Sequence, residues 1–339
     1  MKAIVLVGGF GTRLRPLTLT APKQMLPMGR TTMVEQVVAR LGSFGVTEVV
    51  LSLGYQPDAF QAAFPDSLCA GVRLVYAVEP EPLDTAGAIR FAYDAAGYDE
   101  RVLALNGDVL TDLDVADLWA RHETFGGEAT IALTPVEDPS RYGVVATDAA
   151  GRVEAFIEKP APGTAPSNWI NAGTYVLEPS FLARVVPGTR TSIERDVFPV
   201  VAGEAQLFAV PSDAYWIDAG TPEAYVQAHL DLLDGRREGG AAQGVHPGAT
   251  VDPTAKVQRS FVGDGCVVGA NAEVVDAVLM DGVVVGDGAR VERSVVGAGG
   301  TVGAGASVTG LSVVGFGGEV ATGEVVAGGL VPPPEDWDV

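Results

Sequence analysis

Cysteine, histidine and long apolar runs are scarce in the sequence. It has two cysteines and three histidines among 339 residues. Cys69 and Cys266 lie far apart and match no metal-binding spacing, which argues against a disulfide framework and a zinc site. No segment approaches the ~18 apolar residues of a membrane span, and the first apolar run is too short for a signal peptide. We therefore expect buried thiols and a cytoplasmic protein.

Positive charge is also scarce. Lysine and arginine total 22 against 43 acidic residues, so the formal net charge is −21. This balance argues against nucleic acid or an anionic membrane as a partner, because both reward a basic surface. Anionic small substrates then need a local group of cations. Arg13, Arg15 and Lys23 lie close enough in the chain to form one.

A glycine-rich loop follows the first predicted strand. The apolar run at 3–7 indicates a buried strand, and Gly8, Gly9 and Gly11 come directly after it. Such glycines allow a tight turn with exposed amides that attract phosphate, and Arg13 and Lys23 add charge. A plain glycine turn is the alternative. The dinucleotide fingerprint fails at Leu14, and no G-K-[ST] of a P-loop is present.

Helical and strand patterns alternate in the first hundred residues. Helices are expected at 33–44, 57–64 and 86–96, and strands at 46–53, 72–78 and 102–105. This alternation predicts an α/β, Rossmann-like domain with a mostly parallel sheet. Ligands bind at the carboxyl ends of such strands, where Leu6 and Asp108 both fall. An aspartate there often only caps a turn, and His122 and His229, on predicted helices, are expected to be structural.

The motifs together resemble one family. The stretch L-V-G-G-F-G-T-R-L-R-P-L-T, followed by P-K at Lys23, resembles the opening signature of sugar-1-phosphate nucleotidyltransferases, most closely the mannose-1-phosphate guanylyltransferases. Y-G-V-V, F-I-E-K-P, N-A-G-T-Y, S-I-E-R-D-V-F-P and Y-W-I-D-A-G-T-P resemble later elements of that family. The resemblance implies a catalytic domain at 1–234 that transfers the nucleotidyl group of an NTP to a sugar 1-phosphate. For this family the NTP is GTP and the sugar is mannose 1-phosphate, so the products are GDP-mannose and pyrophosphate. A glucose-1-phosphate thymidylyl- or uridylyltransferase, or a non-catalytic subunit that senses nucleotide sugars, remains an alternative.

The same resemblance implies the roles of individual residues. Arg13, Lys23 and Lys159 are expected to be catalytic, and Asp108 and Asp218 to hold Mg²⁺. The expected nucleotide contacts are Leu6, Gly8, Gly9, Gly11, Thr12, Arg13, Lys23, Glu79, Thr85 and Gly87. The expected sugar-phosphate contacts are Gly143, Glu158, Lys159, Asn171 and Gly173.

Two acidic residues near the predicted base site need separate treatment. Guanine presents two adjacent donors that one carboxylate can accept, so Glu79 favours guanine over thymine or uracil; it could equally be a solvated loop charge. Asp84 replaces the glycine of the family's P-L-G-T-A-G loop. If that position needs a positive φ, aspartate tolerates it better than most residues.

A repeat of seventeen residues fills the C-terminal region. Apolar residues recur every seventeen positions and form columns. One column is Val245, Val262, Leu279, Val296 and Val313. At the same spacing, three further columns run from Val251 as far as Val302, from Val257 as far as Val308 and from Ala255 as far as Ala306. This repeat predicts a parallel β-helix at 245–330, after a linker at 235–244 and before a tail at 331–339. Similar domains in the family are left-handed. Some β-helices of this type are acyltransferases, which commonly use a histidine base within the coils. His246, in the first coil, is the only candidate for that base. We therefore expect the β-helix to have a structural role and to form a homo-oligomer.

Overall fold

The computed structural model describes residues 1–54, 57–238 and 241–337. Two compact units are present. Unit 1 contains Met1–Gly8 and Val34–Trp216, and unit 2 contains Gly9–Met33 and Ile217–Val339. The predicted linker and tail each include two residues outside the described ranges, 239–240 and 338–339. No described helix is both long and apolar enough to cross a membrane.

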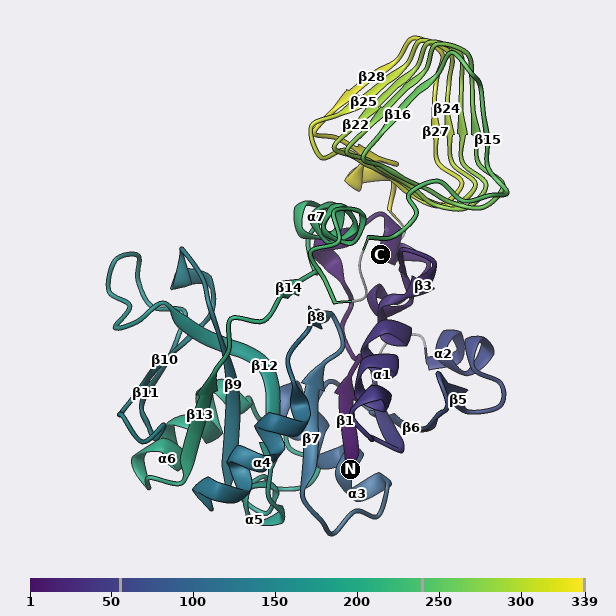
Figure 1. Ribbon diagram of the computed structural model, residues 1–339. Helices are drawn as coiled ribbons and strands as arrows, with labels where there is room; N and C mark the ends of the chain where they lie inside the picture. Colours follow the sequence, from purple (N-terminus) through teal and green to yellow (C-terminus); the bar gives the residue numbers. More distant parts are fainter. Residues whose placement is uncertain (55–56, 239–240, 338–339) are drawn as a thin grey trace. The chain divides into compact units, whose positions relative to one another are not determined.

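Unit 1 is built on one mixed sheet (Figure 1). Its main path runs β11-β10-β12-β7-β1-β4-β6-β5, with β9 and β13 branching from β12. The neighbours β7, β1, β4 and β6 are parallel, as the alternating pattern predicts. The strands of this sheet are β1 (Lys2–Leu6), β4 (Glu48–Leu53), β5 (Leu68–Cys69), β6 (Val72–Val78), β7 (Val102–Asn106), β9 (Ala129–Pro135), β10 (Gly143–Thr147), β11 (Val153–Glu158), β12 (Trp169–Leu177) and β13 (Leu207–Pro211). Outside it are two short strands, β8 (Val109–Thr111) and β14 (Trp216–Asp218).

Helices cover the sheet of unit 1 and enclose its core. They are α1 (Met33–Ser43), α2 (Pro57–Ala63), α3 (Asp84–Ala95), α4 (Val115–Phe125), α5 (Pro179–Leu182) and α6 (Phe198–Gly203). Ile4 and Ala104 of the sheet, Ile89 of α3 and Phe198 of α6 belong to one buried cluster. Burying such side chains is the main stabilising contribution to a domain of this kind.

The expected structural histidine and thiols of unit 1 lie inside it. His122 is fully buried on α4, where Nδ1 bonds Thr130 Oγ1 at 2.8 Å and Nε2 lies 3.2 Å from Glu178 Oε1. Burial lowers the pKa of His122. Cys69 is buried too, and burial raises the pKa of its thiol to about 11. Neither side chain is placed for chemistry, as the sequence predicts.

Unit 2 contains the expected β-helix. Three parallel sheets of five strands form its walls (Figure 1). The valines of successive coils stack in its core. The strands are β15 (Thr250–Val251), β16 (Lys256–Gln258), β17 (Phe261–Val262), β18 (Val267–Val268), β19 (Glu273–Val275), β20 (Val278–Leu279), β21 (Val284–Val285), β22 (Arg290–Glu292), β23 (Val295–Val296), β24 (Thr301–Val302), β25 (Ser307–Thr309), β26 (Val313–Val314), β27 (Glu319–Val320), β28 (Val325–Ala327) and β29 (Leu330–Val331).

One column of the predicted repeat is wrong at its last member. Val313 pairs with Val295, and Val314 continues the stack of Val296. The earlier corners turn on one residue with positive φ, such as Arg293 at 43°, whereas this corner uses both Gly310 at 67° and Leu311 at 65°. The extra corner residue lengthens this coil by one and moves the strand that follows.

Unit 2 also contains α7 and the signature segment, residues 9–33. α7 (Pro222–Leu233) begins as predicted, with the Thr221 hydroxyl accepting from Ala224 N at 3.2 Å and Pro222 in the first turn. The signature segment forms short 3₁₀ turns at Thr12–Leu14, Leu17–Leu19 and Lys23–Met25, then β2 (Pro27–Met28) and β3 (Thr31–Thr32).

Candidate active site

Two predicted site residues of unit 1, Leu6 and Asp108, lie where parallel strands end. Leu6, the last residue of β1, is in register with Asn106, the last of β7. Gly107 N then donates to Leu6 O at 2.9 Å. A Cβ on Gly107 would lie 2.8 Å from that same oxygen, so only glycine fits. This close approach fixes the position at which Asp108 leaves the sheet.

The predicted sugar side also lies against this strand end. Gly173, in β12, has a φ of 71°, and a Cβ there would lie 2.6 Å from Asn106 Nδ2. Asn171 uses both ends of its amide internally: Oδ1 accepts from Gly173 N at 2.9 Å and Nδ2 donates to Tyr175 OH at 2.8 Å. The pairing of β12 with β9 shifts register between Asn171 and Tyr175, and these contacts span that irregularity.

Glu158 and Lys159 lie at the end of β11. Glu158 is in register with Gly143 of β10, and a Cβ on Gly143 would come 3.0 Å from Glu158 Oε2. Lys159 takes a φ of 47°, which turns its chain away from the strand. Its Nζ lies 3.4 Å from Glu158 Oε1, and its side chain is exposed. Glycine at 143 thus leaves room for the Glu158 carboxylate beside an exposed cation.

Glu79 follows β6 and is held by two protein donors. Ser52 Oγ donates to Oε1 at 3.1 Å, and Leu83 N donates to Oε2 at 3.1 Å. A Cβ on Gly8 would lie 3.2 Å from Oε1, so Glu79 adjoins the start of the glycine-rich loop. Each carboxylate oxygen has two acceptor sites, and among the residues that the structure describes one donor is bonded to each. Glu79 is therefore a fixed acceptor rather than a mobile loop charge.

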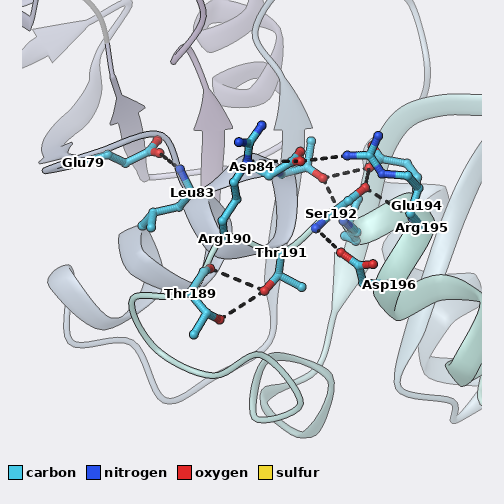
Figure 2. A network of polar contacts seen from close by, with 12 residues as sticks. Glu79, Leu83, Asp84, Thr189, Arg190, Thr191, Ser192, Glu194, Arg195 and Asp196 are labelled. Atoms are coloured by element: carbon cyan, nitrogen blue, oxygen red, sulfur yellow. Dashed lines mark hydrogen bonds and ion pairs between the residues drawn. The ribbon is translucent and has the colours of Figure 1, made fainter.

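Asp84 has the positive φ that its replacement of a glycine suggests, 61°. Figure 2 shows it paired with Arg195: Arg195 Nη2 donates to Asp84 Oδ2 at 2.9 Å, and Oδ1 accepts from Thr85 N at 2.9 Å. Arg190 Nε approaches the same carboxylate to 4.0 Å. The substitution therefore adds an ion pair at a position where the backbone itself favours glycine.

Thr85 joins the same loop to a turn more than a hundred residues later. Its hydroxyl donates to Glu194 Oε2 and accepts from Ile193 N, both at 2.8 Å. Ser192 Oγ donates to the same Glu194 oxygen at 2.8 Å (Figure 2). Ser192 also caps the π turn at Ile193–Val197, as expected of a helix start. The S-I-E-R sequence thus positions the loop through Glu194, a role that local pattern did not indicate.

Gly87 has a packing reason to be glycine. A Cβ there would lie 2.5 Å from Thr189 O. The amides of Ala86 and Gly87 both donate to Thr191 O, at 2.9 and 3.1 Å. The first turn of α3 therefore rests directly on the 189–191 segment.

In unit 2, the signature segment brings its glycines and cations together. Gly11 has a φ of 59°, and Thr18 Oγ1 donates to its carbonyl at 2.8 Å. A Cβ on Gly11 would lie 3.2 Å from Lys23 Cβ, which places Lys23 beside the loop. Gly9 has open space around it, and Thr12 is exposed. Such a loop can present amide groups and cations to an anion.

Arg13 and Asp218 meet in the same unit. Arg13 Nη2 lies 3.8 Å from Asp218 Oδ2, and Oδ1 accepts from Gly220 N at 2.9 Å. The Arg13 side chain is 60% exposed and that of Asp218 28% exposed. The backbone bond orients the carboxylate just before α7 begins. The predicted phosphate cation and predicted metal ligand are thus neighbours.

The donor set expected for Mg²⁺ is a pair of aspartates, one in each unit. Magnesium prefers a few carboxylate oxygens and completes its shell with water and substrate phosphate. Both are carboxylates: Asp108 follows Gly107, whose amide is bonded at the strand end, and Gly220 N orients the carboxylate of Asp218. Within the described ranges, no three His, Cys, Asp or Glu side chains gather into a ready metal cage.

Comparison with known proteins agrees with this architecture. A family model described as nucleotidyl transferase matches residues 2–235, and one described as GMPPB C-terminal domain matches residues 241–336. A solved structure of a Bacillus anthracis protein, described as a glucose-1-phosphate thymidylyltransferase, aligns at 25% identity with a TM-score of 0.61 and covers 68% of this chain and 94% of its own. The sheet and its strand-end loops are those of a nucleotidyl transferase.

Two curated relatives narrow the class. The mannose-1-phosphate guanylyltransferase of Mycobacterium tuberculosis is 38% identical over 81% of this chain and 76% of its own length. The mannose-1-phosphate guanyltransferase of Schizosaccharomyces pombe is 38% identical over 77% and 74%. The chain belongs to the family of these mannose-1-phosphate guanylyltransferases, which confirms the resemblance carried by its motifs.

Proposed function

We propose that this chain transfers the guanylyl group of GTP to mannose 1-phosphate, giving GDP-mannose and pyrophosphate. One observation carries the proposal: a chain of this family holds Arg13 of its exposed glycine loop beside Asp218. A guanidinium next to a carboxylate suits a site that must hold both phosphate oxygens and a divalent cation.

The reaction is an in-line displacement at phosphorus. An oxygen of the sugar phosphate attacks the α-phosphorus of GTP, and the bond from that phosphorus to the bridging oxygen of pyrophosphate breaks. A phosphate monoester has a second pKa of about 6, so the attacking oxygen is already ionised at neutral pH. The site therefore needs no general base, which fits the structural positions of His122 and His229.

The residues of the chain then have to bring two polyanions together. Arg13 and the amides of Gly8, Gly9, Gly11 and Thr12 bind the β- and γ-phosphates, and Lys23 neutralises charge beside them. Lys159 binds the sugar phosphate, with Gly143, Glu158, Asn171 and Gly173 around the sugar. Asp108 and Asp218 hold Mg²⁺, which supplies charge neutralisation for the phosphates when it is bound.

Base recognition is assigned to the loop between β6 and α3. Leu6, Thr85 and Gly87 line the base, and Glu79 accepts the two adjacent donors of guanine. The two fixed hydrogen bonds on Glu79 support this assignment because they orient its carboxylate before the nucleotide arrives. Likeness to a structure described as a thymidylyltransferase makes thymidylyl transfer the second candidate.

Pyrophosphate release by the purified chain tests the proposal. With GTP, mannose 1-phosphate and Mg²⁺ we expect turnover that is lost in Arg13→Ala and Asp108→Ala. No release from a folded wild-type chain would instead support the non-catalytic, sensing subunit. Normal release by the Asp108→Ala variant would contradict the metal assignment alone.

Assembly and location complete the proposal. We place the enzyme in the cytoplasm, where the buried thiols Cys69 and Cys266 stay reduced. We also propose a homo-oligomer through the β-helix, because Val267 and Val284 are 42% and 40% exposed at paired positions of one wall. Light scattering tests this assembly: the wild-type chain should have the mass of an oligomer, and the double variant Val267→Lys, Val284→Lys should have a lower mass.

A further inference from the structure

The C-terminal tail contacts the signature segment. Trp337, in the tail, lies under the guanidinium of Arg15, whose Cζ is 5.8 Å from the ring centroid. We propose that Trp337 is a positioning residue that holds Arg15, and with it the glycine-rich loop, in the conformation that binds nucleotide. The inference rests on the proposed role of that loop.

The tryptophan ring is fixed by its own segment. Trp337 Nε1 donates to Pro332 O at 3.0 Å, and its backbone amide to Pro334 O at 3.3 Å. Three prolines from 332 to 334 restrict the backbone of this turn. These contacts fix the orientation of the indole independently of Arg15.

The Arg15 side chain is partly buried at this contact. Its Nε is buried and has no hydrogen-bond partner among the residues that the structure describes. A guanidinium over an indole face within about 6 Å is attracted by the ring quadrupole, and more strongly where water is excluded. Arg15 is two positions from Arg13, so the stack anchors the 3₁₀ turn that presents Arg13.

A second contact supports the same end of the segment. A Cβ on Gly315 would lie 3.2 Å from Pro16 Cβ and 3.3 Å from its Cγ. Gly315 N donates to Val331 O at 2.7 Å, so the last coil and the start of the tail meet at this point. Glycine at 315 allows Pro16 to rest directly on the backbone of the coil.

The other end of the signature segment is held by α7 and the first coil. The Tyr225 hydroxyl donates to Pro27 O, and a Cβ on Gly29 would lie 3.7 Å from Phe261 Cζ. Other parts of unit 2 thus contact the segment that carries Arg13 and Lys23 at two places, Arg15–Pro16 and Pro27–Gly29. The β-helix then acts as a support for the nucleotide loop.

Steady-state kinetics on the full chain tests the proposal. Trp337→Ala should raise KM for GTP about three- to tenfold, a range that loss of one cation–π contact can account for, with kcat within about twofold. Trp337→Phe keeps a ring face and should recover most of the affinity. Glu335→Ala, an exposed residue of the same turn, is the matched control and should match wild type.

A double-mutant cycle separates positioning from a general structural effect. If Trp337 acts through Arg15, adding Trp337→Ala to Arg15→Ala should change KM no further. Gly315→Ala, which presses on Pro16, should raise KM in the same direction and serves if Trp337→Ala fails to fold. An unchanged KM in folded Trp337→Ala, or additive effects in the cycle, would overturn the proposal.

The outcome also separates this inference from the proposed function. If Arg13→Ala leaves the Kd for GTP, measured by calorimetry, unchanged, the loop is not the nucleotide site and the proposed function fails with the inference. If Arg13→Ala raises that Kd while Trp337→Ala leaves both the Kd and KM unchanged, only the role of the tail is wrong.

Discussion

Arg13 Nη2 lies 3.8 Å from Asp218 Oδ2, although some two hundred residues separate them in the chain. The glycine-rich loop brings one of them, and the turn before α7 brings the other. Opposite charges at this distance attract each other and restrict both side chains. The Arg13 side chain is 60% exposed and that of Asp218 28% exposed, so solvent reaches both.

Replacing Asp218 with asparagine should abolish most turnover. Asparagine can still accept from Gly220 N, so the turn before α7 stays intact while the negative charge is lost. We expect kcat with saturating GTP and Mg²⁺ to fall by about 100-fold or more. Asp213→Asn, an exposed change in the same stretch, should keep wild-type kcat. Near-normal turnover in Asp218→Asn would remove this residue from the metal site.

Replacing Gly107 with alanine should disturb the strand end that carries Asp108. The new Cβ would meet Leu6 O and Val7 Cγ1, both at 2.8 Å. We expect a loss of about 1–3 kcal/mol in the free energy of unfolding, measured by urea titration, and lower kcat. Gly203→Ala, where nothing lies within 4 Å, should unfold like wild type. Equal free energies of unfolding for the two variants would contradict this account, because β1 and β7 would then move apart without loss of stability.

Changing Glu79 to glutamine should alter base preference without loosening the loop. The amide oxygen can still accept from Leu83 N, and the Ser52 hydroxyl can accept from the amide nitrogen. We expect kcat/KM for GTP to fall about ten- to 100-fold relative to that for dTTP. Glu81→Gln, exposed on the same loop, should leave the ratio unchanged. An unchanged ratio in Glu79→Gln would show that base recognition lies elsewhere.

Stability should depend on the protonation of His229 in mildly acidic solution. Its Nδ1 bonds Tyr225 O at 2.9 Å, so Nδ1 carries the proton and the buried Nε2 has no partner within the described ranges. The rings of Tyr225 and Phe261 pack against it at centroid distances of 4.7 and 5.3 Å. Burial therefore lowers the pKa of His229 to about 4.

The sign of the effect follows from linkage. Because the folded pKa lies below the unfolded one, the unfolded chain takes up the proton first, and stability falls as the pH drops from about 6.5 to about 4. Complete loss of this contribution is worth about 3 kcal/mol. His229→Phe should flatten the curve of unfolding free energy against pH, whereas Tyr225→Phe should keep its slope. Equal slopes for wild type and His229→Phe would contradict this account.

Much of the fold could be predicted because its signals are local. Alternating apolar patterns located β6 at its observed bounds, and the seventeen-residue repeat located the coils, since stacked valines must recur at one spacing. The repeat misplaced Val313 because a longer corner, with Gly310 and Leu311, has no counterpart in the earlier coils.

The contacts that support the site could not be predicted in the same way. Thr85 and Glu194 are 109 residues apart, and Arg15 meets Trp337 only because the last coil passes Pro16. No periodic pattern encodes such pairs. The grouping of residues 9–33 with α7 and the β-helix is likewise a consequence of packing, whereas the sequence alone suggested a division at residue 234.

The central claim is guanylyl transfer to mannose 1-phosphate. Pyrophosphate release by the wild-type chain, measured for GTP, dTTP, UTP and ATP against mannose 1-phosphate and glucose 1-phosphate, tests it most directly. We expect the highest kcat/KM for GTP with mannose 1-phosphate, and GDP-mannose as the product identified by mass spectrometry. A preference for dTTP or UTP with glucose 1-phosphate would contradict the account.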